Sequence, residues 1–353
     1  MVEAYLNRVA TAVPPHDVHR KFVEFVPQLL NSARDRALFA RMAQRAQIEH
    51  RYSFLSPHAN AARMDAGDFY RPGHFPNTES RMRFYERHTF ALARSALDGL
   101  EFAKIKNDIT HLIITTCTGF YAPGVDVQVV DHYRLAASIE RTVIGFMGCS
   151  AGMNALKLAR HIVRSEPRAK VAILNLELCT LHLQETQDLE QMLSFLVFAD
   201  GGAASLVSAE PVGLRLDGFH SAVIPATRDQ ITWHIGGLGF DMVLSGRVPK
   251  TIMAALPDSL DAALHGRSRQ DIRHWAVHPG GRSVLQAVQQ SLQLPESALG
   301  FSRDVLRRFG NMSSATIMFV LKEMMQAGQG KGHGCAMAFG PGVTLETMLF
   351  MAG

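Results

Sequence analysis

The sequence predicts an α/β protein, because strand-like apolar runs alternate with segments typical of amphipathic helices. Segments 111–117 and 171–178 are rich in aliphatic and β-branched residues, as expected for buried strands. Segment 151–164 instead spaces its apolar residues about three or four positions apart, which favours a helix with one buried face. The alternation resumes after Pro211, so we expect two α/β halves.

The first half should contain a series of strands around the helix at 151–164. The expected strands are 111–117 (HLIITTC), 142–148 (TVIGFMG), 171–178 (VAILNLEL) and 203–208 (AASLVS).

The second half should repeat this scheme. Its expected elements are a strand at 274–279, helices at 280–293 and 313–328, and two strands within 335–352 joined by a tight Gly-Pro-Gly turn. The stretch from Glu210 to Gly213 is the best boundary, which divides the chain into domains 1–210 and 211–353.

Composition excludes several classes of protein. Of 353 residues, 47% are hydrophobic and 19% charged, unlike a disordered chain. The net charge of +4 is too small for a typical nucleic-acid binder. The sequence has neither a continuous apolar stretch long enough to span a membrane nor an N-terminal secretory signal. We therefore expect a cytoplasmic enzyme.

The cysteines indicate free thiols. Four cysteines in so long a chain do not make a disulfide framework, and they lack the paired spacing of a zinc site, so we expect no metal.

Cys149 is the first candidate for catalysis. It lies in GFMGCSAGMNAL, between an expected strand and an expected helix. A helix N-terminus lowers the pKa of a thiol and favours the nucleophilic thiolate. The alternative is a buried, inert cysteine, and the local sequence leaves both open.

Two further polar residues also lie at the ends of elements. His278 follows a strand in WAVHPGG, and Asn311 precedes a helix in RFGNMSSATIMFVL. Separately, they fit a structural histidine and a helix cap. Together with Cys149 they form a set suited to acyl transfer: a nucleophile, a base or hydrogen-bond donor, and an amide that can stabilise an oxyanion.

The order Cys…His…Asn also fits papain-like proteases. However, the sequence GCSAGM does not match their nucleophile signature. A Cys-His-Asn hydrolase of thioesters or amides stays as an alternative, as does a catalytically silent binding partner.

Four segments together resemble the type III polyketide synthases of the chalcone and stilbene synthase superfamily, and TTCTGF is similar to bacterial members. The segments are GFMGCSAGMNALKLA, WAVHPGG, GNMSSATIMFVL and AFGPGVTLE. The resemblance implies the thiolase fold, with two related α/β halves in a five-layer αβαβα arrangement, and a homodimer.

The resemblance also implies the catalytic roles. Cys149 would carry the starter and the growing chain as a thioester, and His278 and Asn311 would orient malonyl-CoA for decarboxylation. Phe198 and Phe240 would be aromatic gatekeepers of the cavity, although ordinary core packing is the alternative for each.

Other residues match substrate-contacting positions of the family. Arg41 and Arg45, four residues apart on one face of a helix expected within 39–52, would contact CoA phosphates. The third basic position is Leu38 here, and Arg34 or Arg36 could replace it. The remaining positions are Gly280 and Gly281 for CoA, and Cys117, Thr118, His182, Ser313 and the small Ala122 for the cavity. Segment 67–87 is expected to be an exposed excursion without a chemical role.

These features predict an acyl-CoA starter, extended iteratively with malonyl-CoA and released as a cyclised product, with no cofactor beyond the CoA substrates. An alkylpyrone or alkylresorcinol from a fatty acyl-CoA is the leading product class. A polyhydroxynaphthalene or phloroglucinol made from malonyl units alone is the alternative.

Overall fold

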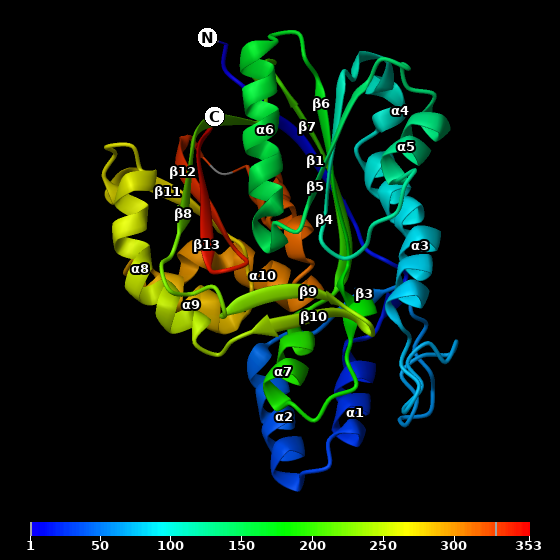
Figure 1. The fold of residues 1–353 in the computed structure, drawn as a ribbon. Helices are drawn as coiled ribbons and strands as arrows, with labels where there is room; N and C mark the ends of the chain where they lie inside the picture. The colour runs from blue at the N-terminus through cyan, green and yellow to red at the C-terminus, as the bar shows by residue number, and fades with distance from the viewer. Residues whose placement is uncertain (1, 329) are drawn as a thin grey trace.

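The computed structural model describes residues 2–328 and 330–353, and it centres on a sheet of nine strands (Figure 1). Both halves of the chain contribute to this sheet, and β1 and β8 join the two contributions. In spatial order the strands are β11 (Ile272–Val277), β12 (Gly332–Gly340), β13 (Thr344–Ala352), β8 (Leu214–Val223), β1 (Tyr5–Ala12), β7 (Asp200–Ser208), β6 (Val171–Leu178), β4 (His111–Thr116) and β5 (Glu140–Gly145).

Helices lie between and outside the two parts of the sheet (Figure 1). Helix α6 (Ala151–Ser165) contacts β4 and β6 on one side and β12 and β13 on the other, and α11 (Thr316–Gln326) contacts both β1 and β11. This confirms the five-layer α/β arrangement. The outer helices are α3 (Thr78–Gly99) and α5 (Val125–Tyr133) next to the first half, and α8 (Val248–Ala263), α9 (Arg282–Ser291) and α10 (Gly300–Phe309) next to the second.

The expected strands and helix of the first half are present, with shifted ends. Strand β5 ends at Gly145 rather than at residue 148, because Phe146 and Gly148 have left-handed φ angles of 56° and 60°. Strand β7 begins at Asp200, a few residues before the expected start, because the pairing with β6 already starts at Asp200 and continues to Val207.

The second half also follows the expected pattern. Gly281 caps α9, so this helix begins at Arg282. The helix expected from residue 313 starts as a 3₁₀ turn, Ser313–Ala315, and continues as α11. Strands β12 and β13 pair in antiparallel register from Gly332↔Ala352 to Gly340↔Thr344, as the hairpin signal predicted.

Several elements were not expected from the sequence, whereas the helix expected within 39–52 is the second part of α2. Helices α1 and α2 pack with α7 into a separate apolar cluster, and the β9–β10 hairpin lies apart from the main sheet. Their bounds are α1 (His19–Leu29), α2 (Ala33–Ala46), α4 (Phe102–Ile105), α7 (Leu189–Val197), β2 (His16–Asp17), β3 (Tyr52–Ser53), β9 (Ile231–Gly236) and β10 (Gly239–Leu244).

The prediction of an exposed excursion at 67–87 was wrong for much of this segment. Helix α3 already begins at Thr78, and the side chains of Tyr70 and Arg81 are buried. The Arg81 guanidinium donates hydrogen bonds to the Tyr70 hydroxyl, to the Leu183 carbonyl at 3.0 Å and to the Leu181 carbonyl. These bonds compensate for burying its charge and tie the segment to the core.

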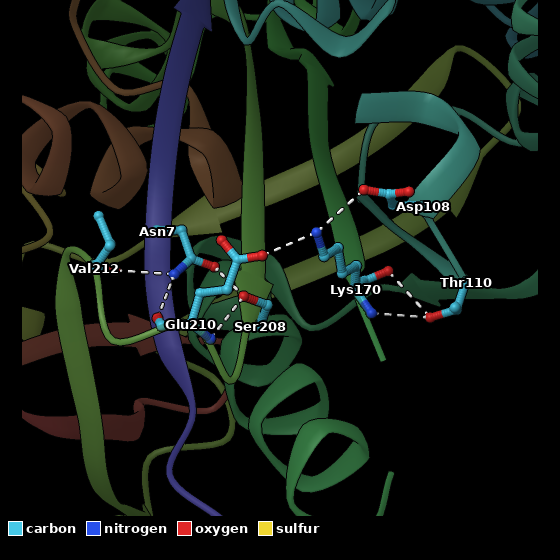
Figure 2. A network of polar contacts seen from close by, with 7 residues as sticks. All are labelled: Asn7, Asp108, Thr110, Lys170, Ser208, Glu210 and Val212. Atoms are coloured by element: carbon cyan, nitrogen blue, oxygen red, sulfur yellow. Dashed lines mark hydrogen bonds and ion pairs between the residues drawn. The ribbon is translucent and has the colours of Figure 1, made fainter. Parts of the chain in front are cut away.

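A polar network holds the link between the halves (Figure 2). The Asn7 amide donates to the backbone carbonyls of Glu210 and Val212, at 2.9 Å each, and Ser208 donates to Asn7 Oδ1 at 2.8 Å. Lys170 Nζ pairs with Glu210 at 2.9 Å, which ties the end of β7 to the start of β6. The link is therefore fixed in place, and the division at Glu210–Gly213 stays a prediction.

Within residues 2–328 and 330–353, no helix has the length and apolar character that crossing a membrane requires.

Candidate active site

A largely apolar cavity lies at the carboxyl ends of the parallel strands β4, β5 and β11. This is where α/β sheets place their ligands. Cys149, His278 and Asn311 all line it, although they come from three distant segments. The remaining lining residues are Cys117, Thr118, Gly148, Cys179, Phe198, Ile231, Thr232, Trp233, Met242, Leu244, Val248, Gly280, Val284, Ser313, Phe339, Gly340 and Pro341.

Cys149 lies in a 3₁₀ turn, Gly148–Ser150, that leads directly into α6. Gly148 makes this turn possible, since its φ is 60° and a Cβ there would lie 2.5 Å from Pro341 Cδ. The local sequence thus places the thiol at the helix N-terminus, as predicted.

The electrostatic effect on Cys149 differs from the prediction. Burial raises the pKa of the Cys149 thiol to about 12, and the hydrogen bonds from the side chains of Ser313 and Asn311 offset this only in part. Desolvation therefore outweighs any benefit from the helix N-terminus. Cys149 rests as a neutral thiol and needs a neighbouring base to become a nucleophile.

The Asn311 backbone is fixed by two hydrogen bonds to the segment after α7. Its N–H donates to the Val197 carbonyl at 2.7 Å, and its carbonyl accepts from Ala199 N–H at 2.9 Å. Its Nδ2 lies 3.9 Å from Cys149 Sγ, and its Oδ1 accepts from the Ser313 N–H at 2.8 Å. Asn311 thus both shapes the turn before α11 and presents an amide to the thiol.

His278 directly follows β11, and its backbone N–H donates to the Met337 carbonyl at 2.8 Å. The side chain is buried, and neither ring nitrogen has a hydrogen-bond partner among the described residues. Burial lowers the pKa of His278 to about 3, so the free ring is neutral. A buried polar ring without partners is costly, which indicates that a ligand or the thiol proton completes its bonding.

Comparison with known protein families accounts for this arrangement. Residues 3–211 match the N-terminal domain of chalcone and stilbene synthases, and residues 216–352 match the C-terminal domain of the same family.

This chain belongs to the chalcone and stilbene synthase family.

Individual relatives agree with this assignment. The synthase is 33% identical over 366 aligned residues to "Alpha-pyrone synthesis polyketide synthase-like Pks18" of Mycobacterium tuberculosis. The alignment covers 98% of this chain and 91% of the relative. It is similar to the structure of 1,3,6,8-tetrahydroxynaphthalene synthase from Streptomyces coelicolor A3(2), with a TM-score of 0.86, 27% identity and 99% coverage of both chains. A polyketide synthase, PKS-I, of the brown alga Ectocarpus siliculosus gives a TM-score of 0.88 at 26% identity, covering 100% of this chain and 99% of the other. The chain is thus a type III polyketide synthase, an acyltransferase.

Several other residues expected at the synthase cavity do line it. Phe198 packs with Cys179 and Met242 beside Cys149, and Cys117, Thr118 and Ser313 lie around the same space. Cys117 Sγ accepts the Gly148 N–H at 3.1 Å, and burial raises the pKa of this thiol well above its usual range. Cys117 is therefore a wall residue that also supports the turn of Cys149.

Three expected cavity residues do not line it. Phe240 lies one step beyond Met242 on the same face of β10, toward the hairpin tip, and packs against His182 instead. His182 is buried behind this ring and is bonded on both nitrogens. Ala122 is exposed on the surface of the single chain. Phe240 is thus excluded by its position along β10 rather than by the face on which its side chain lies.

Sequence reasoning missed the buried carboxyl group of Glu177, although a charged residue inside the apolar run VAILNLEL was a visible signal. Glu177 accepts hydrogen bonds from Cys117 N–H at 3.0 Å, from Thr118 Oγ1 at 2.9 Å and from the Ser314 hydroxyl. These bonds hold the loop after β4 against β6 and next to the cavity. Burial nevertheless raises the pKa of Glu177 to about 7.

Glu177 should make stability depend on pH. Its carboxyl has an ordinary pKa of 4.5 and one of about 7 in the fold, so the folded chain keeps a proton that the unfolded chain releases between these values. The free energy of unfolding should therefore fall as the pH rises from about 4.5 to about 7, by at most roughly 3 kcal/mol. Glu177→Gln cannot ionise, so urea denaturation at pH 5 and pH 8 should show a smaller decline for this variant. Glu79→Gln, at an exposed position, is the control, and an equal decline in Glu177→Gln and the unmutated synthase would contradict the prediction.

A second, open pocket adjoins the cavity, and the two share Leu244, Val248, Gly280 and Val284 as lining residues. Because it shares these walls with the cavity, this pocket, called the entrance pocket below, lies directly beside the space around Cys149.

Of the residues expected to bind CoA, Arg45, Gly280 and Gly281 line this entrance pocket. Arg41 and Leu38 lie earlier on α2 and do not line it. Arg36 is turned away, since it donates to the Leu30 carbonyl at 2.7 Å.

Sequence reasoning missed Arg282, which also lines the entrance pocket and donates to the Arg45 carbonyl at 3.0 Å. The two guanidinium groups thus come from α2 and from the start of α9.

One group of side chains among the described residues has the spacing of a metal site: His111, Glu140 and Glu166, with ligand atoms within 4.8 Å of one another. His111 begins β4, whereas Cys117 follows its other end, and the group shares no residue with the cavity.

Proposed function

We propose that Cys149 carries the starter and the growing polyketide as a thioester. The observation that carries the proposal is the meeting in one cavity of this thiol, the Asn311 amide and the His278 ring, which has no hydrogen-bond partner among the described residues. In loading, His278 takes the thiol proton and Sγ attacks the acyl-CoA carbonyl. The bond to the CoA sulfur then breaks, and CoA leaves with the proton as a free thiol.

Extension uses the same residues. The malonyl C–C bond to the carboxylate breaks, CO₂ leaves, and the electron pair becomes an enolate on the CoA thioester. The Asn311 amide and His278 stabilise the enolate oxygen as charge develops on it. The enolate carbon attacks the Cys149 thioester, the Sγ–C bond breaks, and the lengthened chain returns to Sγ in the next cycle.

The apolar wall supports the decarboxylation step. Phe198 and Met242 are apolar and offer no cation to the malonyl carboxylate. Because the negative carboxylate is poorly solvated beside them, its conversion into neutral CO₂ is favoured. Every step uses only side chains of this chain and CoA thioesters, without a further cofactor.

The entrance pocket supports CoA binding. Arg45 and Arg282 supply positive charge for the phosphates, while Gly280 and Gly281 leave space for the pantetheine arm on its way to Cys149. Arg282, rather than Arg34 or Arg36, takes the place of the basic residue missing at Leu38.

The product we propose is an alkylpyrone or alkylresorcinol made from a fatty acyl-CoA starter. The Mycobacterium tuberculosis relative is named for α-pyrone synthesis, which supports the pyrone class. A malonyl-only naphthalene product is the second candidate, favoured by the likeness to the Streptomyces coelicolor tetrahydroxynaphthalene synthase.

We also propose that the synthase is a homodimer through the edge strand β5. This strand ends the sheet, so one row of its backbone groups is unpaired, and its outer residues are exposed. Val143, Met147 and Phe120 add apolar surface beside it, being 51%, 40% and 38% exposed. A second copy would cover both features and would bring its Ala122 loop close to them. The cytoplasmic location stays a prediction.

The experiment is incubation of the pure protein with malonyl-CoA and a panel of starters from acetyl-CoA to stearoyl-CoA and a cinnamoyl-type CoA, followed by mass spectrometry. We expect pyrones or resorcinols that contain the starter, with a preference for a fatty acyl chain. A naphthalene product without starter would favour the second candidate. Thioester hydrolysis without condensation would overturn the proposal in favour of a hydrolase, and no turnover of any CoA ester would favour a silent partner.

A further inference from the structure

The proposed mechanism assigns no role to Trp233. It lies on β9 beside Met242, its cross-strand partner on β10. Both residues line the cavity. Tryptophan is the bulkiest side chain around this space, and an aromatic ring of this kind covers on the order of 150–250 Å² of surface. Its position therefore influences how large an acyl chain the cavity can hold.

The indole is held in one orientation. Its Nε1–H donates to the backbone carbonyl of Cys117 at 2.7 Å, which ties the hairpin to the loop after β4. His182 packs edge-on against the indole, with ring centroids 5.3 Å apart and an interplanar angle of 79°. A side chain fixed by both a hydrogen bond and a ring contact cannot swing aside to admit a longer ligand without losing both.

His182 is itself immobilised. Its Nδ1 accepts the Phe240 N–H at 3.0 Å, so its Nε2 carries the proton and donates to the Thr118 carbonyl at 2.8 Å. Its ring also stacks on Phe240, with centroids 4.3 Å apart. His182 thus positions Trp233 by connecting the hairpin and the loop after β4 from behind.

Beyond Trp233 the hairpin face leaves the cavity. Ile235, two residues further along the same strand face, is 63% exposed, and Leu238 at the tip is 56% exposed. Phe240, the cross-strand partner of Ile235, is instead buried against Trp233, with ring centroids 6.0 Å apart. A smaller residue at position 233 would therefore lengthen the cavity as far as the buried rings of Phe240 and His182.

We propose that Trp233, positioned by His182, is the wall that sets the upper limit on the length of the acyl chain that the synthase accepts. The proposal rests on the proposed function, because it assumes that the acyl group on Cys149 extends into this cavity. The ligand class concerned is a linear, apolar acyl chain.

The test compares Trp233→Ala with Trp233→Phe. Each variant is mixed with acyl-CoA starters from butyryl to stearoyl, and the acyl group on Cys149 is measured by intact-protein mass spectrometry. For Trp233→Ala we expect loading of long relative to short starters to rise at least tenfold, since each added methylene that finds apolar contact contributes roughly threefold to fourfold. Trp233→Phe keeps most of the ring but loses the indole N–H, so its length limit should stay close to that of the unmutated synthase.

Leu238→Ala is the matched control, because this residue belongs to the same hairpin but does not line the cavity. The control should leave the starter range unchanged. An unchanged starter range in Trp233→Ala, with short starters still loaded at the normal rate, would overturn the proposal.

A binding measurement separates this proposal from the proposed function. The chain has only two tryptophans, so Trp275→Phe leaves Trp233 as the sole indole fluorophore. Fatty acids from octanoate to stearate are titrated into this variant, and their binding to Trp233→Ala is measured by calorimetry. We expect the indole emission of Trp275→Phe to change only with fatty acids up to a defined chain length, and Trp233→Ala to bind longer acids as well. This result would support Trp233 as the limit on chain length even if no acyl-CoA were loaded. Equal binding of all lengths by both variants would contradict it.

Discussion

Cys149→Ala is expected to form no acyl-enzyme and no polyketide, a loss of at least about 10³-fold in turnover. The reason is positional, since Cys149 Sγ is the thiol that lies next to the Asn311 amide in the cavity. The measurement is the mass of the intact protein after mixing with an acyl-CoA, together with product analysis in the presence of malonyl-CoA.

Cys117→Ala and Cys179→Ala are matched controls, because both thiols line the same cavity. Burial raises the pKa of all three thiols, but it is Cys149 Sγ that lies next to the Asn311 amide, so neither Cys117 nor Cys179 should replace it as a nucleophile. Both controls should still acquire an acyl group. An acyl adduct on Cys149→Ala that disappears when Cys117 is also replaced would show that the nucleophile was assigned to the wrong cysteine.

Asn311→Ala should slow malonyl-CoA decarboxylation by about 10²–10³-fold, the usual cost of removing one donor to a developing oxyanion. Starter loading should fall much less, by under about tenfold, because Cys149 and His278 remain in place to transfer the acyl group. The two steps are measured separately. Decarboxylation is followed as release of labelled CO₂ from malonyl-CoA, and loading as acylation of Cys149 by a starter when malonyl-CoA is left out.

A second variant guards against structural damage, because Asn311 Oδ1 also accepts the Ser313 N–H. Asn311→Asp keeps an oxygen for that bond but removes the amide donor. If decarboxylation is lost in both variants while loading persists, the amide acts as a donor. Equal losses in the two steps would instead assign Asn311 to holding the turn before α11.

The sequence predicted much of the fold because its signals are local. The composition and periodicity of segments such as 171–178 and 151–164 are those of a buried strand and a half-buried helix, and they formed β6 and α6 almost to the residue. Local signals also placed Cys149 at a helix start, where Gly148 permits a backbone that other residues would resist. Helix α1, which was not predicted, and α2 owe their positions to packing with α7, which lies far along the chain.

The sequence alone therefore determined the α/β class, the order of most elements and the identity of the three polar residues at their ends. Only the tertiary structure decided that these residues share one cavity, that burial raises the pKa of Cys149, and that Trp233 rather than Phe240 lines this cavity. The physical reason is that desolvation and cavity shape are set by atoms from segments far apart in the chain. Backbone conformation, in contrast, responds mainly to near neighbours.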